Sequence, residues 1–148
     1  MFRIVPLTPI FRRGSPKPAG KHRKAATGRQ PRNRAHFGII ALLPCAVPGC
    51  GAHPVHVAHI RFACVLEGAA HTGKGMKPED WRVLPLCPTH HTEGPDAQHR
   101  MNEEVFWTSH GINPYALARA LWNLSGSIEA MRFLVTHAPQ VFPARRDR

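Results

Sequence analysis

Two close pairs of metal-binding residues constrain the fold of this chain more than any other feature of its sequence. Cys45 and Cys50 bracket a four-residue turn, and Cys87 lies three residues before His90. Thiolates and imidazoles are the preferred ligands of zinc, and a short turn can aim two of them at one ion. We therefore predict a structural zinc site of three cysteines and one histidine. The alternative is that the cysteines are reduced thiols that pack as small hydrophobic side chains.

The charge balance of the chain predicts a polyanionic partner. Among 148 residues there are 20 Lys and Arg but only 9 Asp and Glu, a formal net charge of +11. Nucleic acid is the usual partner, although ribosome-associated and membrane-surface proteins share this imbalance. No apolar run approaches the roughly 20 residues of a membrane helix, and the N-terminus has no signal-peptide pattern. We therefore expect a cytoplasmic protein without a membrane partner, in which clustered cysteines bind metal more often than they form disulfides.

Composition divides the chain into an arm, a domain and a tail. Residues 1–36 are rich in basic residues, proline and glycine and show no apolar period, so we expect a disordered basic arm. This arm would either contact phosphates non-specifically or be a solvated tail without a role. Residues 37–138 are predicted to fold as one domain, with a core over 44–110 and a helical extension over 111–138, followed by a basic tail over 139–148.

The apolar pattern of the domain predicts an α+β fold. Residues 55–60 and 81–86 are β-prone and flank a Gly-rich polar loop, so we expect two short strands joined by that loop. Helices are expected over 95–110, over 114–124 after a capping asparagine, and from Ser127 onward. The aromatic residues of these predicted helices are expected to pack in the core rather than stack on bases: Phe106, Trp107, Tyr115 and Trp122.

A second group of histidines accompanies the predicted zinc site. Adjacent residues in a turn point in different directions, so we expect His91 to face away from His90 and toward His59 and His99. By strand parity His56 should face opposite to His59, and we expect it to lie outside this group. Four further histidines are predicted to have no role: His22, His36, His110 and His137.

Taken in order, these residues resemble the HNH superfamily of endonucleases, whose ββα-metal fold is also called the His-Me finger. The matching segments are the cysteine pair that starts at Cys45, the strand end Ala58-His59-Ile60-Arg61, the loop 73–80 and the run over 85–91. The chain is most similar to the phage and prophage branch of recombination-associated nucleases, of the DUF968 and YbcO type. That branch shares the His-Ile-Arg and Gly-x-Gly-x-Lys-Pro-x-Asp stretches, and the resemblance covers about residues 44–110.

The resemblance implies a zinc-stapled HNH core and a metal-dependent endonuclease that hydrolyses phosphodiester bonds in DNA. His59 would take the proton of the attacking water, and His91 and His99 would hold the catalytic ion, Mg²⁺ or Mn²⁺ with Zn²⁺ as a third alternative. Asp80 matches the middle Asn of the family motif and would orient His59. Three basic residues would contact DNA phosphates: Arg61, Lys74 and Lys77. A phage or prophage origin and a role in DNA recombination or processing follow by the same analogy.

Two departures from the family pattern leave other functions open. Many HNH sites have a metal-binding Asp or His just before the general base, where this chain has Ala58. His99 also follows His91 at a longer interval than its counterpart usually does, with Gly94-Pro95 between them. A catalytically silent zinc module that binds nucleic acid fits these departures, and a protein-assembly factor is a third alternative. Within the nuclease hypothesis the form of the DNA stays open, single-stranded and branched DNA included, and no oligomeric state is predicted.

Overall fold

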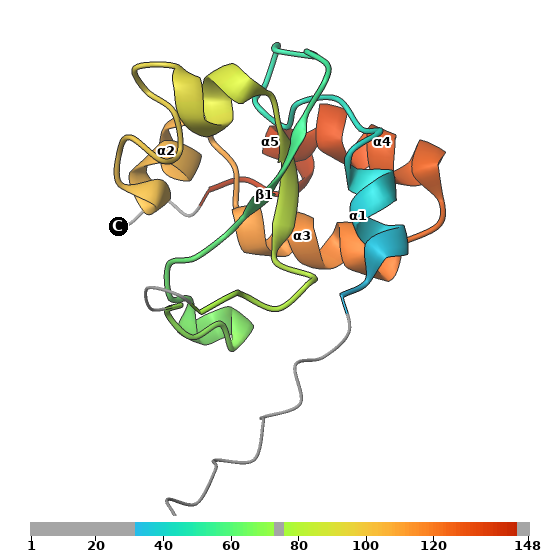
Figure 1. Ribbon diagram of the computed structural model, residues 1–148, viewed down its shortest axis with the longest axis horizontal. Coiled ribbons are helices and arrows are strands. Elements are labelled where there is room, and N and C mark those ends of the chain that lie inside the picture. Colours follow the sequence, from blue (N-terminus) through green and yellow to red (C-terminus); the bar gives the residue numbers. More distant parts are fainter. Residues whose placement is uncertain (1–31, 73–75, 145–148) are drawn as a thin grey trace, which may run out of the picture. The chain divides into compact units, whose positions relative to one another are not determined.

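The computed structural model describes residues 32–72 and 76–144, which combine helices with a two-stranded sheet (Figure 1). The α+β class is thereby confirmed. Lys74 and most of the predicted basic arm lie outside the described residues. In chain order the elements are α1 (Arg34–Ile40), β1 (His56–His59), the 3₁₀ turn η1 (Val65–Glu67), β2 (Val83–Leu86), the π-helical turn η2 (Thr89–Glu93), α2 (Glu103–Ser109), α3 (Pro114–Asn123), α4 (Ile128–Thr136) and α5 (Ala138–Val141).

The two predicted strands pair as an antiparallel ribbon. His56 is opposite Leu86 and His59 is opposite Val83, so the ribbon spans four residue pairs. Pro85 lies inside β2 with its backbone polar groups facing away from β1, so its missing N–H removes no hydrogen bond of the ladder. Its carbonyl instead accepts a hydrogen bond from the N–H of Ala46 at 2.8 Å. All four residues of β2 are buried, and this strand contacts both α1 and α3.

The helical half follows its capping signals. The side chain of Asn113 accepts a hydrogen bond from the Ala116 N–H at 3.1 Å, and Pro114 occupies the first turn of α3. One stripe of α3 is buried against β2 and α4. Of the aromatic residues predicted to pack in the core, Phe106, Trp107 and Tyr115 are buried and Trp122 is half-buried. None of the described helices is long and apolar enough to cross a lipid bilayer.

The helix predicted over 95–110 is wrong in its first half, because α2 begins only at Glu103. Asn102 caps this shorter helix, since its side chain accepts a hydrogen bond from a backbone N–H at 3.0 Å. The preceding residues form turns that fold back on η2, where the N–H of His99 donates to the carbonyl of His91 at 3.1 Å. His99 is therefore held by a turn and not by a helix.

The folded part extends beyond both predicted boundaries of the domain. α1 begins at Arg34, inside the predicted arm, because the side chain of Asn33 caps it by accepting a hydrogen bond from the His36 N–H at 3.0 Å. At the other end, the N–H of Asn113 donates to the carbonyl of Phe142 at 2.8 Å. The first residues of the predicted basic tail therefore pack against the start of α3.

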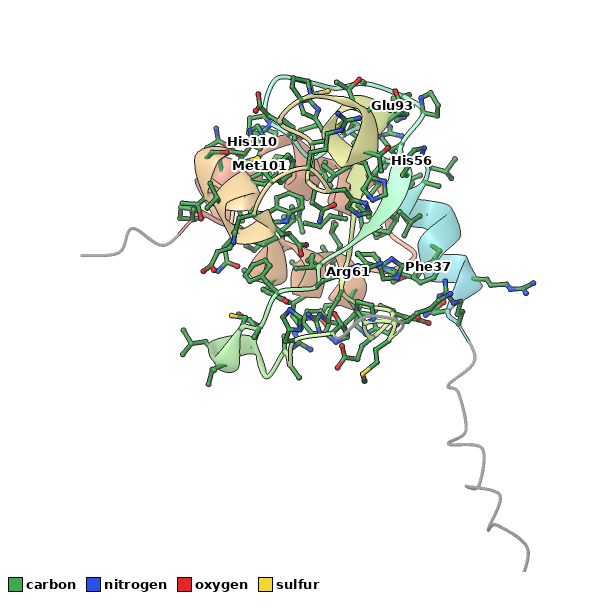
Figure 2. All side chains as sticks on the ribbon, turned by 60° about the vertical axis from the view of Figure 1, so that its left-hand side comes forward. Phe37, His56, Arg61, Glu93, Met101 and His110 are labelled. Carbon is green, nitrogen blue, oxygen red and sulfur yellow. The ribbon has the colours of Figure 1, made fainter. Side chains whose placement is uncertain are left out.

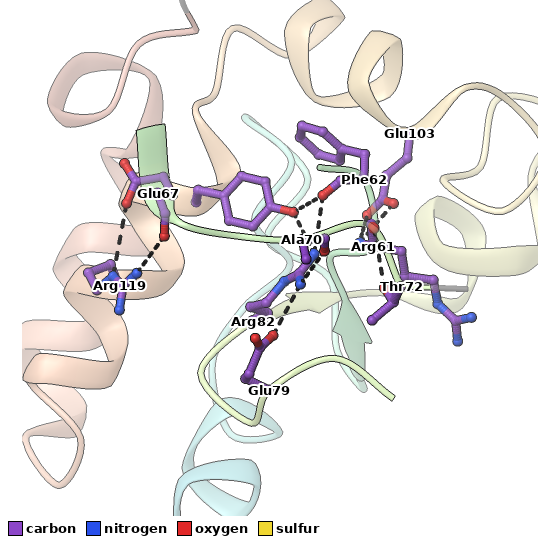
Figure 3. A network of polar contacts seen from close by, with 10 residues as sticks. Arg61, Phe62, Glu67, Ala70, Thr72, Glu79, Arg82, Glu103 and Arg119 are labelled. Carbon is purple, nitrogen blue, oxygen red and sulfur yellow. Dashed lines mark hydrogen bonds and ion pairs between the residues drawn. The ribbon is translucent and has the colours of Figure 1, made fainter. Parts of the chain in front are cut away.

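A buried arginine holds the loop between the strands (Figure 3). The side chain of Arg82 is 1% exposed, and its guanidinium donates to the carbonyls of Ala70 at 2.9 Å and Phe62 at 3.1 Å. It also donates to the Tyr115 hydroxyl at 2.7 Å and to the Glu79 carboxylate at 3.1 Å. The planar fork of donors suits this task, because one side chain can satisfy several acceptors in fixed directions.

Candidate metal centre and adjacent histidine cluster

The four predicted zinc ligands meet at one point. Their donor atoms all lie within 4.8 Å of one another: Cys45, Cys50, Cys87 and His90. The Sγ atoms of Cys50 and Cys87 are 3.8 Å apart, and His90 Nδ1 lies 3.6 Å from Cys45 Sγ and 3.2 Å from Cys87 Sγ. A tetrahedral zinc with Zn–S bonds of about 2.3 Å and Zn–N bonds of about 2.0 Å separates its ligand atoms by roughly 3.5–3.8 Å. The four residues could therefore hold a metal such as zinc.

Local structure delivers the ligands from two sides. In the first turn the N–H of Cys50 donates to the carbonyl of Val47 at 3.1 Å, and Gly49 has a φ of 75°, a conformation that residues with a side chain rarely adopt. On the other side, Cys87 directly follows β2 and His90 lies in η2. The centre therefore ties the turn after α1 to the end of the sheet.

Burial controls the chemistry of the cysteines. Burial raises the pKa of the Cys45 thiol to about 12, with Cys50 and Cys87 contributing further in the same direction and backbone hydrogen bonds opposing it. In the absence of a cation this sulfur is therefore a neutral thiol at neutral pH. A bound divalent cation reverses that preference, because a coordinating thiol is deprotonated.

A second cluster of histidines adjoins the first. The rings of His91 and His99 have centroids 4.5 Å apart, as the sequence predicted. The prediction that His56 stays outside the cluster is wrong, because its Nδ1 lies 3.0 Å from the Nδ1 of His91. The reason is register: His56 pairs with Leu86, the last residue of β2, so its ring reaches the turn that follows this strand. His56 is the first residue of β1 and is labelled in Figure 2.

The environment keeps His91 neutral. Burial lowers its pKa to about 4, and the nearby His99 and His56 lower it further in the same direction. At neutral pH its ring nitrogens are therefore available as a donor and an acceptor rather than as two donors.

His59, the proposed general base, lies in a cavity of about 260 Å³. The cavity is lined by His59, Arg61, Gln98, His99 and Glu103. The Nε2 atom of His59 is buried and has no hydrogen-bond partner within residues 32–72 and 76–144. Burial lowers the pKa of His59, the positive charges of Arg32, Arg61 and Lys77 lower it too, and Asp80 opposes them. His59 is consequently a neutral base at pH 7.

Two residues of this cavity were not foreseen from the sequence. Gln98 is 3% exposed, and its side chain donates to the carbonyl of His59 at 3.1 Å and to the Glu103 carboxylate at 2.7 Å. Glu103 also accepts from the N–H of Arg61 at 3.0 Å, and burial raises its pKa. The signal that could have found Glu103 is the capping Asn102 directly before it, which marks the true start of α2.

The remaining predicted site residues are distributed around this cavity. Arg61 lines it and is exposed, and Lys77 is exposed too. Asp80 accepts a hydrogen bond from the N–H of Asn33 at 2.6 Å. This hydrogen bond connects the start of α1 to the loop before β2. Among the described residues Asp80 makes no hydrogen bond to His59 and acts on it through charge alone.

Two histidines predicted to have no role are part of the packed structure. His36 is fully buried, and its Nδ1 lies 2.8 Å from the Ser125 hydroxyl. The ring of His110 packs against that of His90, with centroids 5.9 Å apart. The prediction is therefore wrong for both as far as structure is concerned.

The two clusters offer different chemistry. The thiolate-rich centre suits a structural zinc ion, whereas the imidazole-rich group suits a divalent transition ion and proton transfer near neutral pH. No protein-family profile, curated protein or solved structure matches the chain.

Proposed function

We propose that this chain is a zinc-stapled HNH-type endonuclease that hydrolyses phosphodiester bonds in DNA. The observation that carries the proposal is a neutral His59 in a cavity shared with Arg61 and His99, beside a Cys3His centre. The HNH core, the phage or prophage origin and the role in DNA recombination or processing come from the motif resemblance.

His59 would serve as the proton acceptor for the attacking water. A general base must be unprotonated at the working pH and must have a nitrogen to offer. Burial and the surrounding cations meet the first condition by lowering the pKa of His59. Its unpartnered Nε2 supports the second, because an orphaned buried polar atom costs about 1–3 kcal/mol and is typical of catalytic groups or of sites that take a water.

Basic side chains around His59 would bind the phosphate. Arg61 and Lys77 were predicted for this role, and Arg32 joins them because its charge also acts on His59. Arg61 is held at its backbone, where its N–H donates to Glu103, so its side chain can reach the DNA while the main chain stays fixed. Phosphate contacts of this kind position a substrate without reading its sequence.

His91 and His99 would hold the catalytic ion. Their rings lie side by side, and His91 is neutral, so their nitrogens are chemically suited to a divalent transition ion. Such an ion, when bound, neutralises phosphate charge and stabilises the leaving oxygen.

A catalytically silent nucleic-acid-binding module is the second candidate. Ala58 favours it, because the position just before the general base carries a methyl group that is fully buried and cannot ligate. This candidate keeps the zinc centre and the basic surface but has no cleavage activity.

Plasmid cleavage distinguishes the two candidates. Purified zinc-loaded protein is incubated with supercoiled DNA and Mg²⁺, Mn²⁺ or EDTA, alongside His59→Ala and His91→Ala. The nuclease proposal expects cleavage by the wild type that EDTA and both substitutions abolish. DNA binding without cleavage under any of the metals, with zinc retained, would instead establish the silent module.

A further inference from the structure

The histidine cluster contains a residue that the motif resemblance does not assign. His56 is exposed at the start of β1, and its Nδ1 lies 3.0 Å from the Nδ1 of His91. The two rings meet at 71° with centroids 5.2 Å apart. Two nitrogens that bind neighbouring positions on one ion at about 2.1 Å each are separated by roughly 3.0–3.4 Å. The observed spacing is that of a hydrogen bond between the two rings and also falls in the range for two ligands of one metal, so an ion can replace the shared proton without a change in this distance.

We propose that His56, His91 and His99 form a three-imidazole site for a divalent transition-metal ion. This inference deepens and rests on the proposed function, because it supplies a third protein ligand for the ion that His91 and His99 would hold. His91 lies between the other two rings, 4.5 Å from His99 by centroid distance. The nitrogens of the three rings do not yet converge on one point among the described residues, so binding requires the exposed side chain of His99 to turn toward the ion.

Strand geometry explains how His56 replaces the missing ligand at Ala58. Side chains two residues apart on a strand share a face, so His56 projects on the same side of β1 as Ala58. Compared with the family pattern, the metal ligand would therefore lie two residues earlier on β1, nearer to η2. Ala58 is fully buried and pairs with Leu84, so its position belongs to the hydrophobic core. The exposed start of β1, where His56 lies, is the part of the strand that a metal ion can reach.

The backbone around the three rings is already fixed. The N–H of His91 donates to the carbonyl of Cys87 at 2.9 Å, and the N–H of His99 donates to the carbonyl of His91 at 3.1 Å. The Cys3His centre anchors the same turn through His90. Binding therefore has to order the side chains of the site but not its backbone, which lowers its entropic cost.

The donor set predicts which ions bind. Imidazole suits Zn²⁺, Ni²⁺, Co²⁺ and Cu²⁺, whereas Mg²⁺ prefers carboxylate and water oxygens. We therefore expect Co²⁺ to bind this site and Mg²⁺ to compete poorly with it.

Cobalt titration tests the site independently of any cleavage. Protein with one zinc per chain is titrated with Co²⁺ by calorimetry and by visible absorption, where sulfur-to-metal bands report any loss of the structural zinc. The wild type should bind one further Co²⁺, and His56→Ala should weaken that binding by about tenfold or more. His56→Asp, which keeps a ligand atom, should restore much of the affinity, and His71→Ala is the matched control at an exposed histidine outside the cluster.

The outcomes separate this inference from the proposed function. No second Co²⁺ in the wild type, or equal affinity in the wild type and His56→Ala, overturns the three-imidazole site whether or not DNA is cleaved. Binding that depends on His56 without any DNA cleavage supports the site and overturns the nuclease.

Discussion

His90 and His91 are neighbours in the chain, yet their rings belong to different clusters. The Nδ1 of His90 lies 3.2 Å from the Sγ of Cys87, while the Nδ1 of His91 lies 3.0 Å from the Nδ1 of His56. One π-helical turn therefore joins the candidate zinc centre to the histidine cluster. If the candidate zinc centre loses its structure, the histidine cluster should therefore lose its structure too.

Removal of the structural metal should unfold the domain. The sheet has only two strands and four residue pairs, and sheets this small need further support. Structural zinc contributes about 10–16 kcal/mol in small zinc-bound domains, which is as large as a typical total stability. A strong chelator, or Cys87→Ser, should abolish cooperative thermal unfolding monitored by circular dichroism.

Cys64→Ser is the matched control for this experiment. Cys64 is half-buried and lies outside the Cys3His group, so its substitution should retain one zinc per chain and a cooperative transition. A chelated wild type that unfolds at the same temperature as the zinc-loaded protein would contradict a structural role for the metal.

Arg82→Met should lower the free energy of unfolding by about 3 kcal/mol. The substitution removes the hydrogen bonds that the buried guanidinium donates to Phe62, Ala70 and Tyr115, and a hydrogen bond to a charged group contributes about 1.5–3 kcal/mol. Urea unfolding measures the change. Arg132→Met, at an exposed position of α4, should stay within about 0.5 kcal/mol of the wild type, and an equal effect of the two substitutions would rule out the buried network as the cause.

Stability should fall in mild acid partly because of His36. Burial lowers its pKa below the usual 6.5, so the unfolded chain binds a proton more readily than the folded one. The resulting stability is fully present above pH 6.5 and is lost as the pH falls from 6.5 through the lower folded pKa. In urea unfolding at a series of pH values, His36→Gln should show a smaller decline below pH 6.5 than the wild type. Parallel curves would mean that His36 does not contribute.

Gln98→Leu should impair cleavage through the position of His59. The leucine cannot donate to the His59 carbonyl or to Glu103, so the cavity loses the link between them. Misplacement of a catalytic group by about 1 Å can cost about 100-fold, so we expect kcat to fall about 10- to 100-fold with a small change in KM. Gln140→Leu, at an exposed position, is the control. A change confined to KM would point to substrate binding instead.

Arg61→Ala should weaken DNA binding and its dependence on salt. Each lost phosphate contact lowers the slope of log K against log salt concentration by about 1. Arg61 keeps its backbone bond to Glu103 in this variant, so zinc content should not change. Fluorescence anisotropy at several salt concentrations measures the slope, with Arg132→Ala as control. An unchanged slope would remove Arg61 from the DNA-binding surface.

Local signals were sufficient to predict several parts of the fold. The cysteine and histidine spacing predicted the Cys3His group, the β-prone runs predicted both strands, and the Asn113-Pro114 pair predicted the start of α3. In each case the determining chemistry lies within a few consecutive residues. The contrast between His90 and His91 was also predictable, because adjacent side chains in a turn diverge.

The errors arose where a distant contact decides the outcome. His56 enters the histidine cluster because of its register with Leu86, and parity within one strand carries no information about register. His36 is buried because Ser125 and Trp122 lie against it. Pro95 suggested a helix start, but the turn is fixed by hydrogen bonds to η2 and the helix begins after Asn102.

Chemical rescue of His59→Ala tests the central claim most directly. The variant and the wild type, each with one zinc per chain, are compared for the initial rate of DNA cleavage with and without added imidazole. The general-base role of His59 predicts a rate lower by about 10²- to 10⁴-fold, with partial recovery when imidazole occupies the space left by the ring. A variant that cleaves at the wild-type rate without imidazole would contradict the account.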